Sequence, residues 1–341
     1  MIIITELLKD PIDEGSKVAA YKILGEIKKI CSAVVFSING DIIFDAKDRK
    51  YSINKFLVNM PFLIEVRNLP QPSILYIPKA SLTFFSVIRA KIINIFTGKD
   101  VFVYSFQPKN YGFISRRIVQ LISPKCVFIP GKVTSQHLTA LGVNNRILSL
   151  GVDDNKYYEF DCERKTELRK QHEIEERKIV FLHVGHIQNS RNLEWLIDVK
   201  GKCPEIEVLI VGSTYNKNDS GLYSKLQDAG IRIITNFISD MEDIYNLADY
   251  YVFPVLKNDG AIETPLSVLE AMACNVPIVT SRFGSLPDTF KQDKDFHYVG
   301  SSDEIVDIIR NHKKNKPNNR EKIKPYTWGH IARRVVEIIE S

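Results

Sequence analysis

The sequence predicts an α/β protein made of two doubly wound domains, each a parallel sheet covered by helices. The chain has 341 residues, which is long enough for two domains of ordinary size, each with its own core. Short β-rich runs alternate with helical stretches, as in parallel strands joined by crossover helices. Apolar residues make up 44% of the chain and charged residues 26%, so the composition argues against a disordered or fibrous protein.

The first half of the chain begins this alternation. Helices are expected over residues 15–30, 111–122 and 133–141, and Gly142 closes the last of them because glycine accepts the left-handed backbone that ends a helix. Strands are expected over residues 1–8, 33–38, 74–78, 101–106, 127–129 and 146–150. These elements form the first predicted domain, residues 1–150.

The second half repeats the rhythm with longer helices. Strands are expected over residues 179–184, 207–211, 232–234, 250–253 and 277–280, and helices over 193–200, 222–229, 241–248, 265–274 and 303–313. The polar stretch 153–177 is interpreted as a linker region, and the chain is expected to pass between the domains at residues 151–153. Ligands of such sheets bind beyond the carboxyl ends of the strands, so two sheets that face each other predict a cleft.

Basic charge is concentrated in the first half. The net charge is +5 overall, but residues 1–150 carry 20 Lys and Arg against 10 Asp and Glu, whereas the remainder carries 26 against 31. A basic domain beside a mildly acidic one indicates an anionic partner, such as a membrane surface, a lipid phosphate or a nucleic acid. No nucleic-acid-binding motif is present, so we expect no nucleic-acid partner.

One segment suits a membrane contact. Residues 79–99 read KASLTFFSVIRAKIINIFTGK, with Phe85, Ile88, Ile92 and Phe96 at helical spacing and basic residues among them. The alternative is a crossover helix buried against its own sheet, because the apolar face of a helix more often packs in a protein core.

The expected location is the cytoplasm. No run of about 20 apolar residues is free of charge, and the first residues lack the pattern of a signal peptide. The five cysteines are scattered without a disulfide-like or metal-binding spacing, which predicts reduced thiols that pack in the interior. Peripheral association with the inner face of the membrane is a further hypothesis, based on the basic first half.

The most informative stretch is a short helix with marked ends. Thr264 is a suitable N-cap, Pro265 a suitable first helical residue, and Asn275 a suitable left-handed residue after the helix. The first amides of such a helix have no partner inside it, and the helix dipole favours negative charge there. The amides of Leu266 and Ser267 therefore predict a site for a diphosphate.

Two glutamates flank this helix. Glu270 lies on it, at a depth where a carboxylate can accept hydrogen bonds from two ribose hydroxyls, and Glu263 stands just before it, on the side of the sugar. Either glutamate alone would more often be a solvated surface residue. The two together, around one capped apolar helix, favour a binding site.

Residues 263–281 resemble the donor-binding motif of the retaining GT-B glycosyltransferases of family 4, the glycosyl transferases group 1. Other stretches agree in order along the chain, namely 148–153, 182–191, 236–240, 248–254 and 325–328. The resemblance is good from about residue 125 onward and weak before it. It implies a GT-B fold of two Rossmann-like domains, with a nucleotide-sugar-binding domain over 151–325 and a terminal helix, 326–341, that crosses back to the first.

The resemblance also implies roles for individual residues. Gly185, His186 and Arg191 would form the turn and the cations that neutralise the diphosphate, and the backbone of Ile238 would meet the base. Gly15, in the turn after the first strand, resembles the glycine loop that opens towards donor and acceptor; an ordinary turn is an equal alternative.

The sequence departs from the family pattern in two places. Glu263 and Glu270 are seven positions apart, whereas the family's two glutamates are usually eight apart. His186 and Arg191 stand where the family has arginine and lysine, so the charge at the diphosphate depends on whether His186 is protonated.

These features predict a retaining glycosyltransferase that moves a sugar from a nucleotide-diphosphate donor to a hydroxyl of a glycan or lipid-linked acceptor. Glu263 and Arg191 are the expected catalytic residues, and Thr264, Leu266, Ser267 and Glu270 join the donor-binding set. No metal or other cofactor is expected, because helix amides and cations can stabilise the leaving diphosphate. Two alternatives stay open: a nucleotide-sugar epimerase of the same fold, and a paralogue that binds sugar without turnover.

Overall fold

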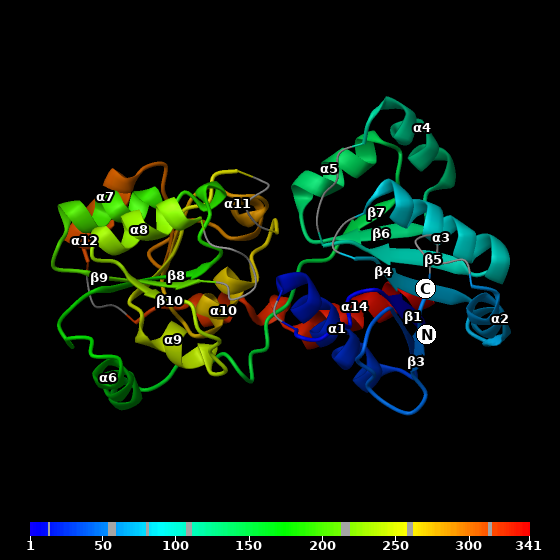
Figure 1. Cartoon of the computed structure of the whole chain (residues 1–341), viewed down its shortest axis with the longest axis horizontal. Coiled ribbons are helices and arrows are strands. Elements are labelled where there is room, and N and C mark those ends of the chain that lie inside the picture. The colour runs from blue at the N-terminus through cyan, green and yellow to red at the C-terminus, as the bar shows by residue number, and fades with distance from the viewer. Residues whose placement is uncertain are drawn as a thin grey trace. The chain divides into compact units, whose positions relative to one another are not determined.

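The computed structural model describes residues 1–12, 14–53, 59–79, 82–106, 111–212, 219–257, 262–312 and 316–341. Its internal contacts divide the chain into two compact units. One comprises Met1–Gly151 together with Trp328–Ser341, and the other comprises Val152–Thr327. The chain therefore leaves the first unit after Gly151 and returns to it at Trp328 (Figure 1).

The first unit is built on a parallel sheet. In the described part of the chain this sheet has seven strands in the order β3-β2-β1-β4-β5-β6-β7. The strands are β1 (Ile2–Thr5), β2 (Val34–Ile38), β3 (Arg49–Tyr51), β4 (Ser73–Ile77), β5 (Asp100–Tyr104), β6 (Cys126–Ile129) and β7 (Asn145–Ile147). The central strand β1 is completely buried and pairs Ile2 with Val34 on one side and with Ile74 on the other.

Helices cover both faces of this sheet. They are α1 (Gly15–Ile30), α2 (Met60–Asn68), α3 (Phe84–Thr97), α4 (Phe113–Ile122), α5 (Lys132–Ala140) and α14 (Trp328–Glu340). The connection from β1 to β2 runs towards one edge of the sheet, whereas those from β4 through β7 run towards the other. Right-handed crossovers therefore place α1 on one face and α3, α4 and α5 on the opposite face, as Figure 1 shows. Helix α14 packs against α1.

Within the segment 79–99, residues Phe84–Thr97 form the crossover helix α3. The hydroxyl oxygen of Thr83 caps it by accepting a hydrogen bond from the amide of Ser86 at 3.1 Å, and Gly98 ends it with a left-handed φ of 70°. The helix packs on the sheet through Val87, Ala90 and Ile93. The predicted apolar face, Phe85, Ile88, Ile92 and Phe96, is not the buried one; these four side chains are half-buried or exposed.

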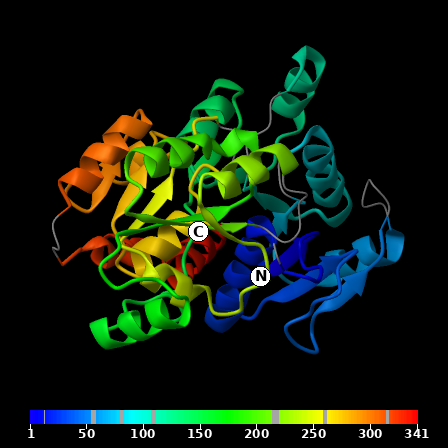
Figure 2. The same ribbon diagram turned by 60° about the vertical axis from the view of Figure 1, so that its left-hand side comes forward.

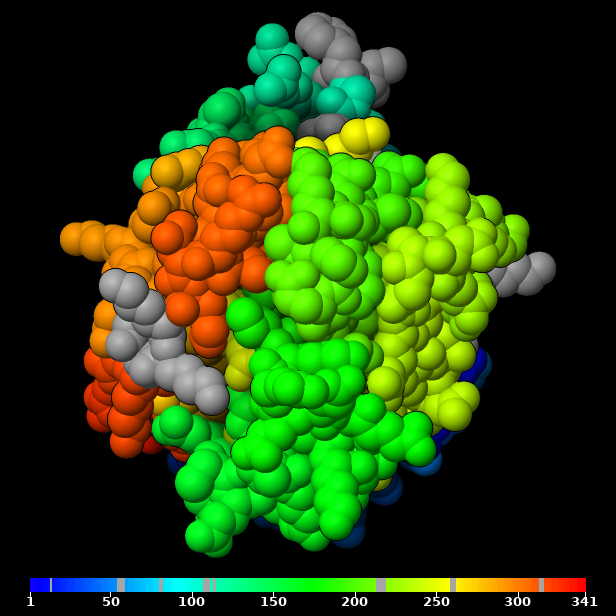
Figure 3. Space-filling model, turned by 90° about the vertical axis from the view of Figure 1, so that its left-hand side faces the viewer, coloured from blue at the N-terminus to red at the C-terminus, as the bar shows by residue number. Residues whose placement is uncertain are grey.

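The second unit has a smaller parallel sheet. Its six described strands follow the order β10-β9-β8-β11-β12-β13. They are β8 (Val180–Gly185), β9 (Glu207–Gly212), β10 (Arg232–Ile234), β11 (Tyr250–Phe253), β12 (Ile278–Thr280) and β13 (Phe296–Tyr298). The α-helices are α6 (Cys162–Gln171), α7 (Glu194–Lys202), α8 (Ser220–Asp228), α9 (Met241–Leu247), α10 (Leu266–Ala273), α11 (Leu286–Thr289), α12 (Ser302–Arg310) and α13 (Asn319–Lys322), and the 3-10 turns are η1 (Asn189–Arg191) and η2 (Lys324–Tyr326). Figure 3 shows the face of this unit that carries α6, α7 and α12.

The interpretation of residues 153–177 as a linker is wrong. Helix α6 lies within this stretch and belongs to the second unit. The carboxylate of Asp161 caps it, accepting a hydrogen bond from the amide of Arg164 at 2.8 Å. The buried side chain of Arg169 donates hydrogen bonds to the carbonyl of Leu247 and to the carboxylate of Asp249, which fix the helix to the strand β11 region.

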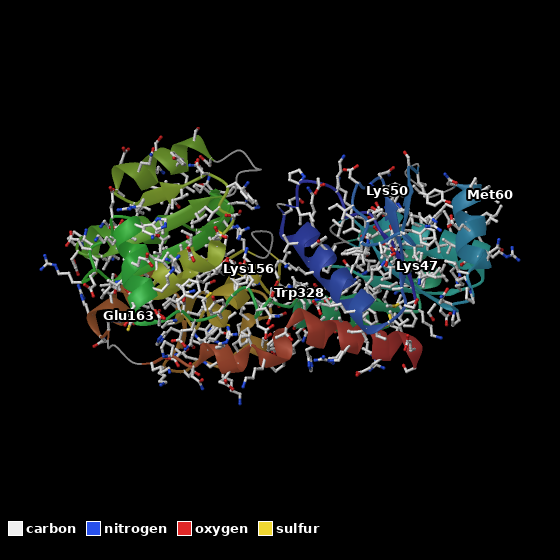
Figure 4. The ribbon with its side chains drawn as sticks, turned by 90° about the horizontal axis from the view of Figure 1, so that it is seen from below. Lys47, Lys50, Met60, Lys156, Glu163 and Trp328 are labelled. Atoms are coloured by element: carbon white, nitrogen blue, oxygen red, sulfur yellow. The ribbon has the colours of Figure 1, made fainter. Side chains whose placement is uncertain are left out.

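The two passages between the units lie next to each other in the structure. A Cβ atom on Gly151 would lie 2.7 Å from the backbone nitrogen of Trp328, the residue that begins α14 and is labelled in Figure 4. One residue further on, the amide of Val152 donates to the carbonyl of Tyr326 at 2.8 Å. Gly151 therefore has no room for a side chain.

Candidate functional site

The residues predicted to bind a diphosphate lie at the carboxyl edge of the second sheet. Strand β8 ends at Gly185, and the turn after it leads through η1 to Arg191. Strand β11 leads towards α10, whose first turn contains Ser267. The hydroxyl of Tyr251 on β11 donates to the Oγ atom of Ser267 at 2.7 Å and lies 3.3 Å from the carbonyl oxygen of Val184. Tyr251 thus connects the end of β8 with the beginning of α10.

Helix α10 begins one residue later than predicted. Pro265 is its N-cap, with an extended ψ of 129°, so the prediction that Thr264 caps the helix and Pro265 is its first residue is wrong. Thr264 is fully buried. The amides of Leu266 and Ser267 are still the first two of the helix and have no acceptor within it. Asn275 follows the helix with a left-handed φ of 60°, as predicted.

Arg191 is a buried cation in this site. It is 9% exposed, none of the described carboxylates lies within ion-pair distance of it, and its Nε atom has no hydrogen-bond partner among the described residues. Burial lowers the pKa of its guanidinium, which nevertheless stays charged at neutral pH. A buried charge without a partner is costly, so this position favours an anion.

The turn that carries Arg191 is fixed by its neighbour. Asn192 has a left-handed φ of 54°, and its side-chain amide donates to the carbonyl of Pro254 at 3.1 Å. Burial raises the pKa of Tyr251, and the nearby guanidinium of Arg191 opposes that rise. Arg191, Tyr251 and Ser267 therefore belong to one cluster of side chains.

Two histidines accompany Arg191. His183 is fully buried on β8, and its Nδ1 atom lies 2.9 Å from the carbonyl oxygen of Val252, which places the proton on Nδ1. Its Nε2 atom has no partner among the described residues, and burial lowers the pKa of His183 to about 4. Burial, and to a smaller extent Arg191, also lowers the pKa of His186. Both rings are therefore neutral at pH 7, and Arg191 alone supplies charge in this cluster.

Gly185 leaves the space in which these groups meet. A Cβ atom there would lie 3.2 Å from Nε2 of His183 and 3.6 Å from an Nη atom of Arg191. A side chain at this position would crowd the ring of His183 and stand in van der Waals contact with Arg191, which favours glycine here.

Glu270 points towards two tyrosines. Its carboxylate accepts a hydrogen bond from the hydroxyl of Tyr245 at 2.7 Å and also interacts with that of Tyr157. Both phenols have raised pKa values, caused first by burial and then by the charge of Glu270. They are therefore hydrogen-bond donors at any physiological pH and hold the carboxylate in place.

Glu263 lies inside the protein rather than at an open surface. It is 3% exposed, and its carboxylate accepts a hydrogen bond from the hydroxyl of Ser285 at 2.7 Å. The left-handed Gly284 approaches so closely that a Cβ atom on it would lie 2.6 Å from the carbonyl oxygen of Glu263. These contacts link Glu263 to the turn before α11.

The remaining predicted residues lie elsewhere. Ile238 is half-buried in the turn between β10 and α9, next to Phe237, which is 78% exposed. Gly15 belongs to the first unit, where it is the first residue of α1.

The sequence analysis did not identify Tyr251, Tyr245 and His183 as site residues. An aromatic residue or a histidine on a buried strand or helix usually indicates core packing. Within the described ranges no group of three or more His, Cys, Asp or Glu could hold a metal ion.

Comparisons with known proteins agree with the resemblance. Residues 164–328 match the family model described as Glycosyl transferases group 1. Sulfoquinovosyl transferase SQD2 of Arabidopsis thaliana is 27% identical over 174 residues, which are 49% of this chain and 32% of the plant protein. The O-antigen biosynthesis glycosyltransferase WclY of Escherichia coli is 20% identical over 249 residues, covering 70% of this chain and 68% of WclY. The chain thus spans about a third of the first of these relatives.

Solved structures resemble the whole chain. Sucrose-phosphate synthase of Thermosynechococcus elongatus superposes with a TM-score of 0.78 at 14% identity, covering 99% of this chain and 98% of that one. Alr3699/HepE of Anabaena, in complex with UDP, gives a TM-score of 0.78 at 13% identity, with 99% of both chains covered. Likeness at such low identity shows the fold alone, and it confirms the predicted α/β fold of two doubly wound sheets.

Proposed function

Because residues 164–328 match the family model described as Glycosyl transferases group 1, we propose that this chain is a glycosyltransferase that uses a nucleoside diphosphate sugar as donor. The second unit binds the donor, and the first unit shapes the acceptor site.

The observation that carries this proposal is the buried guanidinium of Arg191 near the beginning of α10. Two features favour negative charge at the same place: a cation without a described carboxylate partner, and the amides of Leu266 and Ser267 at the positive end of a helix dipole. A diphosphate fits both, because one phosphate can accept from the amides while the other accepts a bidentate pair of bonds from the guanidinium. His186 adds a neutral hydrogen-bond donor.

The rest of the nucleotide follows along the same edge of the sheet. Glu270, held in place by its tyrosines, accepts hydrogen bonds from the ribose hydroxyls. The backbone of Ile238 contacts the base. UDP is the first donor nucleotide to test, since the similar structure of Anabaena HepE is a complex with UDP.

The proposed reaction is transfer with retention at the anomeric carbon. The bond from that carbon to the diphosphate oxygen breaks, and the acceptor oxygen bonds to the carbon on the same face. The acceptor proton passes to the departing phosphate oxygen, so no protein base is required. Arg191 and the α10 amides stabilise the charge that grows on the diphosphate. Glu263 is proposed to orient the turn beside the sugar through Ser285, and no metal or other cofactor takes part.

The acceptor is proposed to be a hydroxyl of a glycan or of a lipid-linked sugar, as in the assembly of a polysaccharide. The similarity to an O-antigen biosynthesis glycosyltransferase and to a sulfoquinovosyl transferase supports a transferase that acts in such a pathway.

Calorimetric titration of the full chain with UDP, GDP and ADP tests the donor site. We expect one nucleotide to bind in the micromolar range and its sugar conjugate to be consumed only when an acceptor is added. Isomerisation of the free nucleotide sugar without acceptor would identify an epimerase instead. Binding without any turnover in an acceptor screen would identify a non-catalytic sugar-binding protein, and no binding of any nucleotide would overturn the proposal.

A further inference from the structure

The basic charge of the first half is confined to part of the first unit. Residues 79–150 contain ten Lys and Arg but only one acidic residue, Asp100. Residues 1–78 contain ten Lys and Arg against nine Asp and Glu, so they are almost neutral. The excess therefore belongs to the part of the chain that runs from the end of β4 to β7.

This part of the chain forms one side of the unit. Helices α3, α4 and α5 lie on the same face of the first sheet, opposite the face that carries α1 and α14 (Figures 1 and 2). Neither α3 nor α4 contains an acidic residue. Arg116 and Arg117 on α4 are exposed, and none of the described carboxylates forms an ion pair with them. We call the outer surface of α3 and α4 the basic face.

Large apolar side chains stand among these cations. Ile95 and Phe96, at the end of α3, are 66% and 42% exposed, and Leu121, at the end of α4, is 82% exposed. The ends of the two helices are neighbours, because Asn94 and Ile122 line the same hollow of about 200 Å³. Ile95, Phe96 and Leu121 thus stand exposed near the ends of these two neighbouring helices. Lys91 and Lys125 line the hollow, together with Asp100, which pairs with Lys125 at 3.2 Å.

We propose that the basic face docks on an anionic lipid bilayer, with Ile95, Phe96 and Leu121 entering the headgroup region and the cations contacting lipid phosphates. Charge complementarity selects the partner: Arg89 is paired with Glu6 and Lys125 with Asp100, but the exposed Arg116 and Arg117 have no described carboxylate partner, so this surface keeps a positive excess that the negative leaflet attracts. The apolar side chains distinguish a bilayer from a nucleic acid or an acidic polysaccharide, because only the bilayer offers hydrocarbon. None of the described helices is long and apolar enough to span a membrane, so the contact is peripheral.

Co-sedimentation with vesicles tests the inference, using the full chain and either pure phosphatidylcholine or a mixture with 30% phosphatidylglycerol. We expect binding to the mixed vesicles only, and its loss in high salt. The double variant Arg116→Gln/Arg117→Gln should bind roughly 25-fold more weakly, since each cation near an anionic surface contributes about fivefold. The double variant Ile95→Ser/Leu121→Ser should also bind more weakly, and high salt should weaken it further.

Matched controls come from α1, on the opposite face of the sheet. Lys29 is 72% exposed in its side chain and Ile30 is 42% exposed, so Lys29→Gln and Ile30→Ser make the same kinds of change outside the basic face. They should bind vesicles like the wild type. Equal weakening by the control variants, or no binding of the wild type to mixed vesicles, would overturn the inference. So would unchanged binding of the Ile95→Ser/Leu121→Ser variant, which would leave a purely electrostatic contact.

The outcome is independent of the donor site. UDP binding, measured on the same variants, should match that of the wild type and shows that each variant is folded. Loss of vesicle binding with UDP binding retained leaves the proposed function intact, whereas absence of UDP binding in a chain that still binds vesicles counts against the proposed function alone.

Discussion

Replacement of Arg191 by methionine should separate binding from stability. Methionine has a similar length and no charge, so it fills the same buried space. In the ligand-free protein it removes a cation that has no described carboxylate partner, and the free energy of unfolding should stay the same or rise by about 1 kcal/mol. In the complex it removes two charge-assisted hydrogen bonds of about 1.5 kcal/mol each, or about 3 kcal/mol in total. The Kd for UDP should therefore rise by roughly 100-fold.

Two measurements on the same sample check this expectation. Urea unfolding without ligand gives the stability, and isothermal titration with UDP gives the Kd. Arg177→Met is the control, because Arg177 belongs to the same unit and its side chain is 91% exposed; neither quantity should change. If Arg191→Met bound UDP like the wild type, the guanidinium would have no part in holding the diphosphate. If it unfolded far more easily without ligand, Arg191 would be a structural residue and the reasoning from its burial would fail.

Three further predictions concern other residues. The folded pKa of His183, about 4, lies below the unfolded value of about 6.5, so stability from its neutral ring is complete above pH 6.5 and is lost as the pH falls towards 4. At pH 5 this loss of stability is about 2 kcal/mol. Urea unfolding at pH 7 and pH 5 measures it, and in the His183→Asn variant the loss should disappear. A variant whose stability depends on pH as the wild type's does would contradict the prediction. Glu270→Gln should raise the Kd for UDP about tenfold but leave that for the 2′-deoxy, 3′-deoxy analogue nearly unchanged, and an equal loss for both nucleotides would exclude contact with the ribose. Gly151→Ala should destabilise the protein by about 1–3 kcal/mol, because the new Cβ meets the backbone of Trp328. The control Gly201→Ala, in open space on α7, should not destabilise it. Equal urea midpoints for the two variants would refute the argument.

Sequence periodicity was most informative where an element has one buried face. Helix α1 has the predicted bounds, since Ala19, Ala20, Ile23 and Ile27 form a regular buried stripe. Strands β10 and β11 also begin and end where the pattern places them. Strands β1 and β7 each end three residues earlier than predicted, because apolar residues continue beyond the last paired one.

Elements without an apolar stripe were missed. Helix α6 has the sequence CERKTELRKQ, in which charged residues surround the axis, and its attachment depends on Arg169 reaching acceptors that are about 80 positions away in sequence. The short strand β3, with the sequence RKY, lies at the edge of its sheet, where one side needs no apolar partner. Such elements depend on tertiary contacts that a local pattern does not contain.

The candidate site was predicted in outline only. Residue types and spacing indicated a cation and a helix start, and both lie at one edge of the second sheet. What the sequence did not contain was the network between them: the hydroxyl of Tyr251 on Ser267, the phenol of Tyr245 on Glu270, and the absence of a described carboxylate beside Arg191. The cap of α10 was misplaced because proline fixes φ but not ψ, so the chain was free to stay extended at Pro265.

The chain leaves the first unit after Gly151 and returns at Trp328, and these two residues are neighbours in space. The second unit is therefore a continuous insertion in the first. Both of its ends emerge at one point, where Val152 and Thr327 pair as a single β-bridge. A segment with such ends can be excised, exchanged between homologous chains, or chosen as the site of a circular permutation without leaving a gap in its host. Residues 152–327 expressed alone should accordingly fold and bind UDP, and the host chain, closed by a short link from Gly151 to Trp328, should keep its own sheet.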